Sequence, residues 1–346
     1  MPIVTLAKRY RERSMSESTD FSIPAPDMRL PGVSVVLPIL NEERFLSDAI
    51  STILAQRYEG PLEVILALGP SKDRTNQIAV EIAQGDPRVV LVENPSGRTA
   101  AALNAAIASS KFPIICRIDG HAEIAPTYIQ SAVMAMEQTQ AVNVGGIMAA
   151  AGIGLFERAV ASAMRSPLGV GAARFHTGGK AGPTDTVYLG TFKKDALIAI
   201  GGYDERFTRA QDWELNFRLR QAGGVIWFDP ELMVTYRPRP NLRALAKQYF
   251  EYGRWRRAVS RNHKGTINLR YLAPPVTVVI VTLSLILGAS VNSLIFIPAL
   301  GYLLGNVMGS FVIGKSLGEK LLLPIILVTM HFSWGVGFIT SPRDLI

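Results

Sequence analysis

Three apolar blocks near the C-terminus limit most strongly how this chain can fold. They cover residues 273–289, 291–314 and 321–339. Each block is close to the roughly 20 residues that a helix needs to cross a lipid bilayer. A single block of this kind could form a buried core helix, but three in succession predict a transmembrane region of about three helices over residues 272–346.

Positive charges around these blocks indicate an orientation. The chain has a net charge of +8, and many of its basic residues lie between Arg237 and Arg270, directly before the first block. Lys315 and Lys320 lie between the second and third blocks. Since short basic loops stay on the cytoplasmic side, we expect a multi-pass protein of the cell membrane with a cytoplasmic N-terminal domain. The blocks would run outward, inward and outward, unless the short joint at residues 290–292 folds the first two into a re-entrant hairpin.

The basic segment before the first block, residues 237–271, is predicted to form an amphipathic helix at the membrane surface. Its basic residues are interleaved with aromatic ones, including Tyr249, Tyr252 and Trp255. Anionic lipid headgroups attract basic segments, and aromatic rings favour the membrane interface. We therefore expect membrane lipids as partners, and no nucleic acid.

Strands and helices are predicted to alternate in the first half of the chain. Residues 34–40 and 62–68 are almost wholly apolar, which is typical of strands buried on both faces of a parallel sheet. The pattern predicts an α/β fold with a mostly parallel sheet in a domain of residues 31–236, after a flexible arm of residues 1–30. The predicted strands are 34–40, 62–68, 88–92 and 112–118, and the predicted helices are 45–54, 76–83 and 99–109.

The middle of the chain is less regular. Residues 145–190 are rich in glycine and alanine and show no clear periodicity, apart from a strand expected over residues 186–190. Cys116, the single cysteine, lies in an apolar run and is expected to be buried rather than reactive. Farther on, spacing predicts a helix over 212–221, a short strand over 225–228 and a helix over 241–263.

Asp119 and His121 follow the predicted strand 112–118 and are candidate metal ligands. At a turn, a carboxylate and an imidazole two residues apart can converge. Together with water and phosphate oxygens, they suit a divalent cation bound to a diphosphate. The alternative is an ordinary Asp-Gly turn followed by a surface histidine.

Asp212 is the candidate general base. It lies at the start of a predicted helix, where a carboxylate is often only a cap or a partner of the helix dipole. A reaction in which a hydroxyl group attacks an electrophilic carbon needs such a carboxylate to accept the proton.

Further candidates lie at other strand ends and in the basic helix. Asp73 could recognise a nucleoside or cap the following helix, and Arg98 could reach a phosphate or turn the chain. Arg254, beside Trp255, could bind diphosphate oxygens or lipid headgroups. His176 could contact an acceptor, although an ordinary loop residue is the simpler interpretation.

Taken in order, seven segments resemble glycosyltransferase family 2, with its nucleotide-sugar-binding GT-A fold. The segments are 35–43 (VVLPILNEE), 71–75 (SKDRT), 97–104 (GRTAAALN), 117–121 (RIDGH), 190–197 (GTFKKDAL), 201–205 (GGYDE) and 211–215 (QDWEL). The basic helix and the apolar tail are similar to those of succinoglycan-type glucosyltransferases, which extend lipid-linked glycans. The resemblance therefore implies a GT-A domain followed by a helical transmembrane region.

The resemblance also implies roles by position. Asp119 would contact the nucleotide and a Mg²⁺ or Mn²⁺ ion, His121 would stand in place of the family's second metal-binding aspartate, and Asp212 would be the catalytic base. The donor would be a nucleotide sugar, with a UDP-sugar favoured. The residues implied at the donor are Pro38, Glu42, Asp73, Arg98, Asp119, Arg254 and Trp255.

Three departures from the family pattern affect these roles. Residues 68–71 read LGPS where many members carry Asp-Asp-Gly-Ser, so an acidic residue that often reads the base is missing. Gln211 stands where the family often has a glutamate beside the catalytic aspartate. The spacing before Arg254 and Trp255 also differs from the family's glutamine-led pattern.

The expected activity is a metal-dependent, inverting transfer of a sugar, a hexose by resemblance, to a lipid-linked or membrane-proximal glycan. A close alternative is a polyprenyl-phosphate glycosyl synthase, whose anionic acceptor needs little base catalysis. A non-catalytic membrane scaffold would need neither Asp119 nor Asp212. A nicotinamide oxidoreductase would need Gly-x-Gly-x-x-Gly after the first strand, where this chain has PILNE at residues 38–42.

Overall fold

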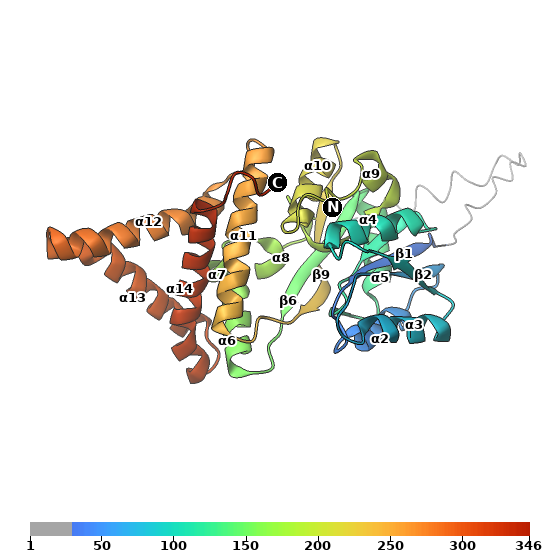
Figure 1. The fold of residues 1–346 in the computed structure, drawn as a ribbon, viewed down its shortest axis with the longest axis horizontal. Coiled ribbons are helices and arrows are strands. Elements are labelled where there is room, and N and C mark those ends of the chain that lie inside the picture. Colours follow the sequence, from blue (N-terminus) through green and yellow to red (C-terminus); the bar gives the residue numbers. More distant parts are fainter. Residues whose placement is uncertain (1–29) are drawn as a thin grey trace, which may run out of the picture. The chain divides into compact units, whose positions relative to one another are not determined.

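The computed structural model describes residues 30–346, so the arm predicted for residues 1–30 lies outside the described part of the chain except for Leu30. Strands and helices alternate in the first half, as the apolar pattern predicted (Figure 1). These elements are β1 (Val33–Ile39), α2 (Leu46–Leu54), β2 (Leu62–Leu68), α3 (Thr75–Gly85), β3 (Val89–Glu93), α4 (Thr99–Ser109), β4 (Ile114–Arg117), β5 (Glu123–Ile124), α5 (Tyr128–Thr139) and β6 (Asn143–Ala150).

One sheet contains all the strands, in the order β3-β2-β1-β4-β8-β6-β9-β5, with β7 paired to β9. Strands β1 to β4 pair in parallel, as do β6 and β9, whereas β8 joins β4 and β6 through short antiparallel pairings. The prediction of a mostly parallel sheet is confirmed, within a sheet that is mixed. The later strands are β7 (Gly182–Pro183), β8 (Tyr188–Lys193) and β9 (Ile226–Tyr236).

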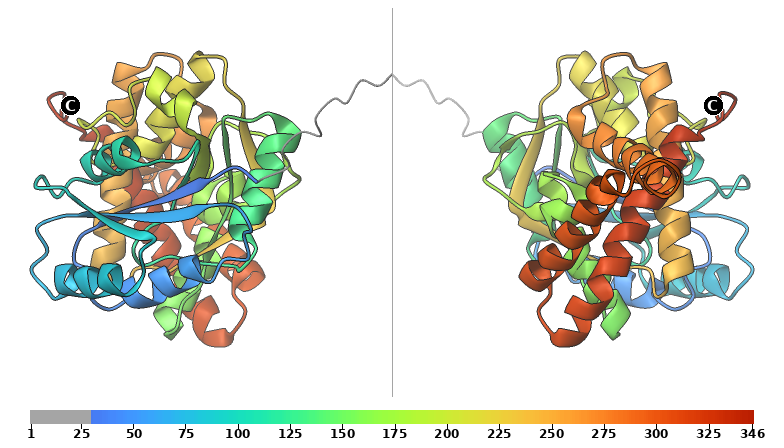
Figure 2. Two further views of the ribbon diagram at one scale, coloured as in Figure 1. Left: turned by 90° about the vertical axis from the view of Figure 1, so that its right-hand side faces the viewer. Right: turned by 90° about the vertical axis from the view of Figure 1, so that its left-hand side faces the viewer.

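Both faces of the sheet are covered by helices. In β1, Val35 and Leu37 pack in one core with α2, α3 and α5, while Val36 points to the opposite core with α4. Figure 2 shows α2 and α3 on the face opposite α4. Burial on both faces explains why β1 and β2 are almost wholly apolar. Their two polar residues, Ser34 and Glu63, are buried and hydrogen-bonded to each other at 2.6 Å. Cys116 in β4 is fully buried, as predicted.

The glycine-rich segment 145–190 passes through the end of β6, three helices, β7 and the start of β8. Its glycines allow close packing of backbones, which no periodicity reveals. A Cβ atom at Gly146 would lie 1.9 Å from the carbonyl oxygen of Leu232 in β9. The strand expected over residues 186–190 is present as β8, which begins two residues later, at Tyr188. The helices are α6 (Leu155–Met164), α7 (Pro167–Val170) and α8 (Arg174–Thr177).

Strand β9 is longer than the short strand predicted over residues 225–228. Asp229-Pro230 is a turn signal, yet the chain bulges there and then continues as a strand. Its pairing with β6 shifts register between Phe228 and Met233. A proline is tolerated at such a bulge because no ladder hydrogen bond is lost. The predicted end of the strand was therefore wrong.

Long helices form the C-terminal part. Helices α10 and α11 occupy the ranges that the spacing predicted, after the short α9. The three predicted apolar helices are also present, and each is long and apolar enough to cross a membrane. These elements are α9 (Lys194–Ala199), α10 (Gln211–Gln221), α11 (Leu242–Asn262), α12 (Leu269–Ser290), η1 (Ser293–Phe296), α13 (Ile297–Ile313) and α14 (Leu317–Ile339).

Helix α14 packs lengthwise on the protein, beside α11 (Figure 1). Leu323 and Met330 are fully buried in a core that α14 shares with α6 and α11. Nearer its C-terminal end, a Cβ atom at Gly337 would lie 2.1 Å from the carbonyl oxygen of Phe250. The backbones of α11 and α14 therefore touch, which ties the apolar helices to the rest of the chain.

We expect Gly337→Ala to destabilise the protein, because the added methyl group meets backbone that cannot rotate away. Overpacking of this kind costs about 1–3 kcal/mol, which should lower the midpoint of thermal unfolding in detergent by several degrees. Gly305→Ala in α13 is the control, since its Cβ would meet no atom within 4 Å. Equal melting of both variants would contradict the close packing of α11 on α14.

Candidate active site

The candidate site lies at the edge of the sheet where β1, β2 and β4 end. These strands are neighbours and run in parallel. Their carboxyl ends therefore bring together three loops that are distant in sequence. The loops are residues 40–45 after β1, 69–74 after β2 and 118–122 after β4.

Hydrogen bonds join the loops after β1 and β2. Asn41 accepts a hydrogen bond from the Lys72 backbone N–H at 2.8 Å. The backbone N–H of Glu42 donates to Thr75 Oγ1 at 2.7 Å. Asn41 itself adopts a left-handed conformation, with φ of 57°, which asparagine tolerates better than most residues. These hydrogen bonds hold the two loops in one arrangement.

Asp73, predicted at the nucleoside, takes part in this loop framework. Its Oδ1 atom accepts hydrogen bonds from the hydroxyl group of Thr75 at 2.5 Å and from the Thr75 backbone N–H at 3.1 Å. Its other oxygen lies 3.4 Å from the backbone nitrogen of Glu43. The hydrogen bond from the Thr75 hydroxyl is the main cause that lowers the pKa of Asp73. Asp73 is therefore an ionised residue that shapes the loop at the start of α3.

Arg117, the last residue of β4, brings the two main candidate carboxylates together. Its Nη2 atom lies 3.1 Å from Asp119 Oδ1, and its Nη1 atom forms a close ion pair with Asp212. The Arg117 side chain is 5 % exposed. A buried guanidinium needs anionic partners, so Arg117 connects the end of β4 to the first turn of α10. Asp119 and Asp212, far apart in sequence, thus share one cation.

Burial and charge act in opposite directions on the pKa values of Asp212 and Arg117. Burial is the main cause that raises the pKa of Asp212, and the neighbouring Arg117 opposes the rise. Burial is the largest single effect on Arg117 and lowers its pKa, but Asp212, Asp119 and Tyr203 together outweigh it, so the pKa of Arg117 is raised. Asp212 still has 31 % of its side chain exposed. It is therefore a reachable carboxylate with a proton affinity above that of an exposed aspartate.

His121 contacts Glu42 across the loops that follow β4 and β1. Its Nδ1 atom lies 2.8 Å from Glu42 Oε1, and this hydrogen bond is the main cause that raises the pKa of His121. If Nδ1–H donates to the carboxylate, Nε2 is left with a lone pair, as in histidines that bind metals. Within residues 30–346 the Nε2 atom makes no hydrogen bond. Both predicted ligands, Asp119 and His121, therefore lie at the same edge of the sheet.

These side chains fit a cation that is shared with a substrate rather than a closed metal centre. No group of three or more His, Cys, Asp or Glu side chains in the described part of the chain is arranged to hold a metal ion. Mg²⁺ and Mn²⁺ are commonly held by one or two protein ligands plus phosphate oxygens and water. Asp119 and His121 can supply such a pair, and imidazole suits Mn²⁺ better than Mg²⁺.

Three further predicted residues, Pro38, Arg98 and Trp255, make different contacts around the site. Pro38 lies in β1 opposite Ala67. Arg98, just before α4, donates to the carbonyl oxygen of Glu205 at 3.3 Å, so it reaches the loop that precedes α10. Trp255 packs on Phe207 of the same loop. These contacts join the loop of residues 201–210 to the start of α4 and to α11.

Arg254 points elsewhere in this structure. Its Nη1 atom lies 3.0 Å from Glu251, three residues earlier in α11, and its guanidinium lies over the ring of Phe250. The side chain is 26 % exposed. Arg254 is thus paired along its own helix, whereas its neighbour Trp255 is buried against the loop before α10.

Arg117 is the residue whose importance the sequence interpretation missed. It lies in the segment RIDGH, where only Asp119 and His121 received roles. The available signal was a single basic residue at the end of an apolar strand, because a charge in that position needs a partner. The identity of that partner, Asp212, depends on tertiary packing and could not be read from spacing.

Comparison with known proteins identifies the family of the chain. The sequence profile of "Glycosyl transferase family 2" matches residues 34–201. The chain is 31 % identical over 310 residues to "Succinoglycan biosynthesis protein ExoA" of Rhizobium meliloti, covering 88 % of this chain and 93 % of that protein. It is 22 % identical over 319 residues to "Dolichyl N-acetyl-alpha-D-glucosaminyl phosphate 3-beta-D-2,3-diacetamido-2,3-dideoxy-beta-D-glucuronosyltransferase" of Methanococcus voltae, covering 88 % of this chain and 95 % of that protein.

A solved structure with the same fold is the mannosyltransferase PcManGT from Pyrobaculum calidifontis, in complex with GDP-Man and Mn²⁺. It aligns with a TM-score of 0.57 at 18 % identity, over 97 % of this chain and 94 % of that one. The likeness confirms the GT-A fold that the sequence motifs implied. Together with the long match to the Rhizobium protein, it leads to one conclusion: the chain belongs to glycosyltransferase family 2.

Proposed function

We propose that the protein is an inverting glycosyltransferase that moves a sugar from a nucleoside-diphosphate donor to a lipid-linked or membrane-proximal glycan at the cytoplasmic face. The observation that carries this proposal is the shared contact of Asp119 and Asp212 with Arg117. Through this contact, one guanidinium binds both Asp119, the carboxylate expected at the donor, and Asp212, the candidate base. Direct displacement at an anomeric carbon needs both groups in one site.

In the proposed mechanism, Asp212 accepts the proton of the acceptor hydroxyl as its oxygen attacks the anomeric carbon. The bond from that carbon to the donor diphosphate breaks on the opposite face, so the configuration inverts and a nucleoside diphosphate leaves. The raised pKa of Asp212 makes it a stronger base than an exposed aspartate. Arg117 keeps the carboxylate of Asp212 oriented. A cation held by Asp119 and His121 would neutralise charge on the leaving diphosphate.

For the donor, a UDP-sugar is our first choice on the basis of the family motifs, and the transferred sugar would be a hexose. The Pyrobaculum neighbour binds GDP-Man with Mn²⁺, which supports a nucleoside-diphosphate sugar and a divalent cation for this fold. Glu42, Asp73 and Pro38 would lie at the nucleoside. The hydrogen bond between Asn41 and Lys72 supports that placement, because it orders the two loops that would contact the nucleoside.

For the acceptor, the names of two relatives support a lipid-linked glycan. One takes part in succinoglycan biosynthesis, and the other acts on a sugar joined to dolichyl phosphate. An acceptor carrying a sugar hydroxyl needs a base, whereas polyprenyl phosphate itself would need little. The ion-paired and partly exposed Asp212 therefore favours the hydroxyl acceptor over polyprenyl phosphate, and favours an enzyme over a scaffold.

We expect Asp212→Asn to lower transfer by on the order of 10²–10⁴-fold, the usual contribution of a general base, with donor binding retained. The measurement is release of nucleoside diphosphate by detergent-solubilised protein with UDP-, GDP- and dTDP-sugars and a lipid extract as acceptor. The control is Asp204→Asn, which removes a carboxylate that, among residues 30–346, is ion-paired with its neighbour Arg206 alone.

Three results would change the proposal. Full activity in Asp212→Asn would favour polyprenyl phosphate as acceptor. Equal loss in Asp204→Asn would point to a general defect of the loop before α10. Absence of both turnover and donor binding in the wild type would favour a scaffold.

We expect His121→Gln to raise the Mn²⁺ concentration for half-maximal activity by at least about tenfold, because one of two protein ligands is lost. EDTA should abolish the wild-type activity, and Mn²⁺ should restore it. His121→Asp should keep activity and shift the preference towards Mg²⁺, since carboxylates suit Mg²⁺ better than imidazole does. An unchanged metal requirement in both variants would remove His121 from the metal site.

A further inference from the structure

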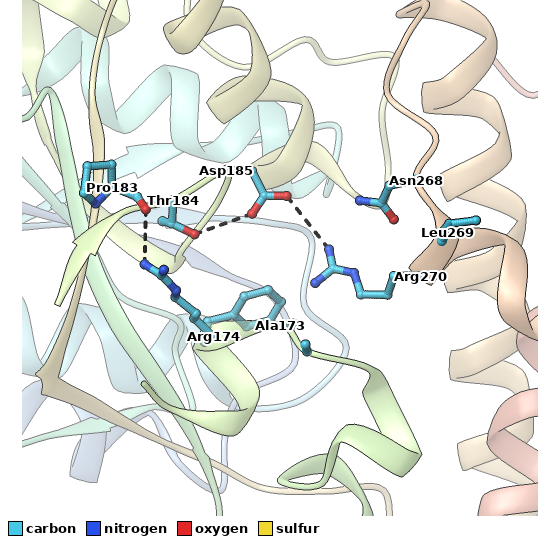
Figure 3. A pocket seen from close by; sticks show the side chains of 10 residues that line it. Ala173, Arg174, Pro183, Thr184, Asp185, Asn268, Leu269 and Arg270 are labelled. Carbon is cyan, nitrogen blue, oxygen red and sulfur yellow. Dashed lines mark hydrogen bonds and ion pairs between the residues drawn. The ribbon is translucent and has the colours of Figure 1, made fainter. Parts of the chain in front are cut away.

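A cavity of about 620 Å³ lies where the sheet meets the start of the first apolar helix (Figure 3). Its walls come from residues 172–175 and 183–185 on one side and from residues 268–270 on the other. Asn268 caps α12 by accepting a hydrogen bond from the backbone N–H of Tyr271. The cavity is thus placed where the chain passes from the sheet to the predicted membrane region.

The lining of this cavity carries an excess of positive charge. Arg174 and Arg270 face it from opposite walls, and Asp185 is the one carboxylate among the lining residues. The closest oxygen of Asp185 lies 3.9 Å from Arg270 Nη2, which is at the limit of an ion pair. Within the described part of the chain, the Arg174 guanidinium donates one hydrogen bond, to the carbonyl oxygen of Pro183 at 3.2 Å. Arg270 Nη2 also donates a close hydrogen bond to the hydroxyl group of Tyr271. The remaining N–H groups of the two guanidiniums make no hydrogen bond within residues 30–346 and are free to donate to an anion.

Gly171 explains how Arg270 is positioned. A Cβ atom at Gly171 would lie 2.8 Å from Arg270 Cγ, and its φ of +68° is a conformation that other residues avoid. The stem of Arg270 therefore packs directly on this glycine.

Arg256 of α11 adds a third guanidinium beside the cavity. It is 5 % exposed and lies between the rings of Trp213 and Tyr271, 3.7 Å from each centroid. Its Nη2 atom donates to the carbonyl oxygen of Thr266, but Nε and Nη1 have no partner within residues 30–346. Burial, with repulsion from Arg270, lowers the pKa of Arg256 to about 10. A buried cation of this kind is stabilised by a nearby anion.

We propose that this cavity binds the phosphate or diphosphate group that joins the acceptor glycan to its lipid. The inference rests on the proposed function, and it names the part of the acceptor that is recognised. Arg174 and Arg270 would donate charge-assisted hydrogen bonds to the phosphate oxygens. Trp213, stacked on Arg256, directly follows Asp212, so a lipid beside α12 would present its phosphate here and its sugar towards the base.

The test measures binding of a fluorescent prenyl diphosphate to the full chain in phosphatidylcholine nanodiscs. Saturating UDP and Mg²⁺ keep the donor site occupied. We expect Arg174→Gln and Arg270→Gln to weaken binding at least about tenfold, and Arg270→Lys to recover part of it, since one charged hydrogen bond contributes about 1.5–3 kcal/mol. Arg243→Gln, an exposed position at the start of α11, is the control for charge near the membrane.

Unchanged binding in both glutamine variants would overturn the proposal, as would no binding by a wild type that turns over donor. The latter result would leave the proposed function standing. Displacement of the fluorescent prenyl diphosphate by inorganic diphosphate would support a phosphate-binding site in the cavity. Equal competition by phosphatidylglycerol would reveal a general headgroup surface and overturn the assignment to the acceptor.

A second, independent observation concerns the path of α14, whose two ends are both bonded to the rest of the protein. At its start, Glu319 is 4 % exposed and accepts a hydrogen bond from Ser162 of α6 at 3.1 Å. Just after its end, Arg261 of α11 donates to the carbonyl oxygens of Ser341 and Pro342 at 2.8 and 2.6 Å. Leu345 then packs near Trp255.

Both ends of α14 therefore lie on the side of the sheet. A helix that crossed the bilayer would have its ends on opposite sides. It would also carry along α11, whose arginines would be costly at the bilayer centre. By contrast, the joint between α12 and α13 is exposed, with Val291 at 72 % and Leu294 at 69 %.

We infer that α12 and α13 enter the bilayer as a hairpin and that α14 lies along the membrane surface. The expected third, outward crossing by residues 321–339 is replaced by this arrangement. Lys315 and Lys320 stay cytoplasmic in either case, so the charge pattern alone could not separate the two topologies.

The test is labelling of an introduced cysteine by a membrane-impermeant maleimide, in spheroplasts of a bacterial host. The background is Cys116→Ser. Asp344→Cys, at an exposed position, should react only after the membrane is permeabilised, as should the cytoplasmic control Arg243→Cys. Labelling of Asp344→Cys in intact spheroplasts, with the control unlabelled, would overturn the hairpin.

Discussion

The contact of Arg117 with two carboxylates is the interaction on which the rest of the site depends. The guanidinium is held at the end of a central strand, where water is scarce, so it cannot be left without anionic partners. Removing one partner of a buried pair commonly costs about 3–5 kcal/mol. Asp119 follows the same strand directly. Asp212 lies in α10, which comes four strands later along the chain. Arg117 thus fixes the distance between the half of the fold that holds β1 to β4 and the half that carries α10.

The loops of the site are ordered when the protein folds, so little conformational entropy remains to be lost when a donor binds. The loops after β1 and β2 are joined by hydrogen bonds between Asn41 and Lys72 and between Glu42 and Thr75. Arg98 and Trp255 hold the loop before α10 from two sides. A donor that meets such preformed loops loses little further conformational freedom, and groups already oriented act more strongly on developing charge.

Much of this could be predicted from the sequence, because it depends on local pattern. Strands buried on both faces leave continuous apolar runs, and the parallel order then brings Asp119 and its neighbouring loops to one edge. Other features depend on partners that are distant in the chain. Gly146 matters because of Leu232, Arg117 because of Asp212, and the bulge of β9 because of its register with β6. Composition also marks α14 as apolar, but it does not distinguish a helix that faces lipid from one that is covered by α11 and α6.

The stack of Trp213, Arg256 and Tyr271 connects the membrane region to the chemistry. Tyr271 lies in the first turns of α12, and Trp213 directly follows Asp212. Because both rings lie 3.7 Å from one buried guanidinium, the start of α12 cannot move relative to α10 without breaking these contacts. In the proposed arrangement, the depth of α12 in the bilayer would therefore set the height of Asp212 above the lipid surface. An acceptor whose phosphate bound in the proposed cavity would then reach Asp212 only with the sugars that span this fixed height, so the anchor would select acceptors by length.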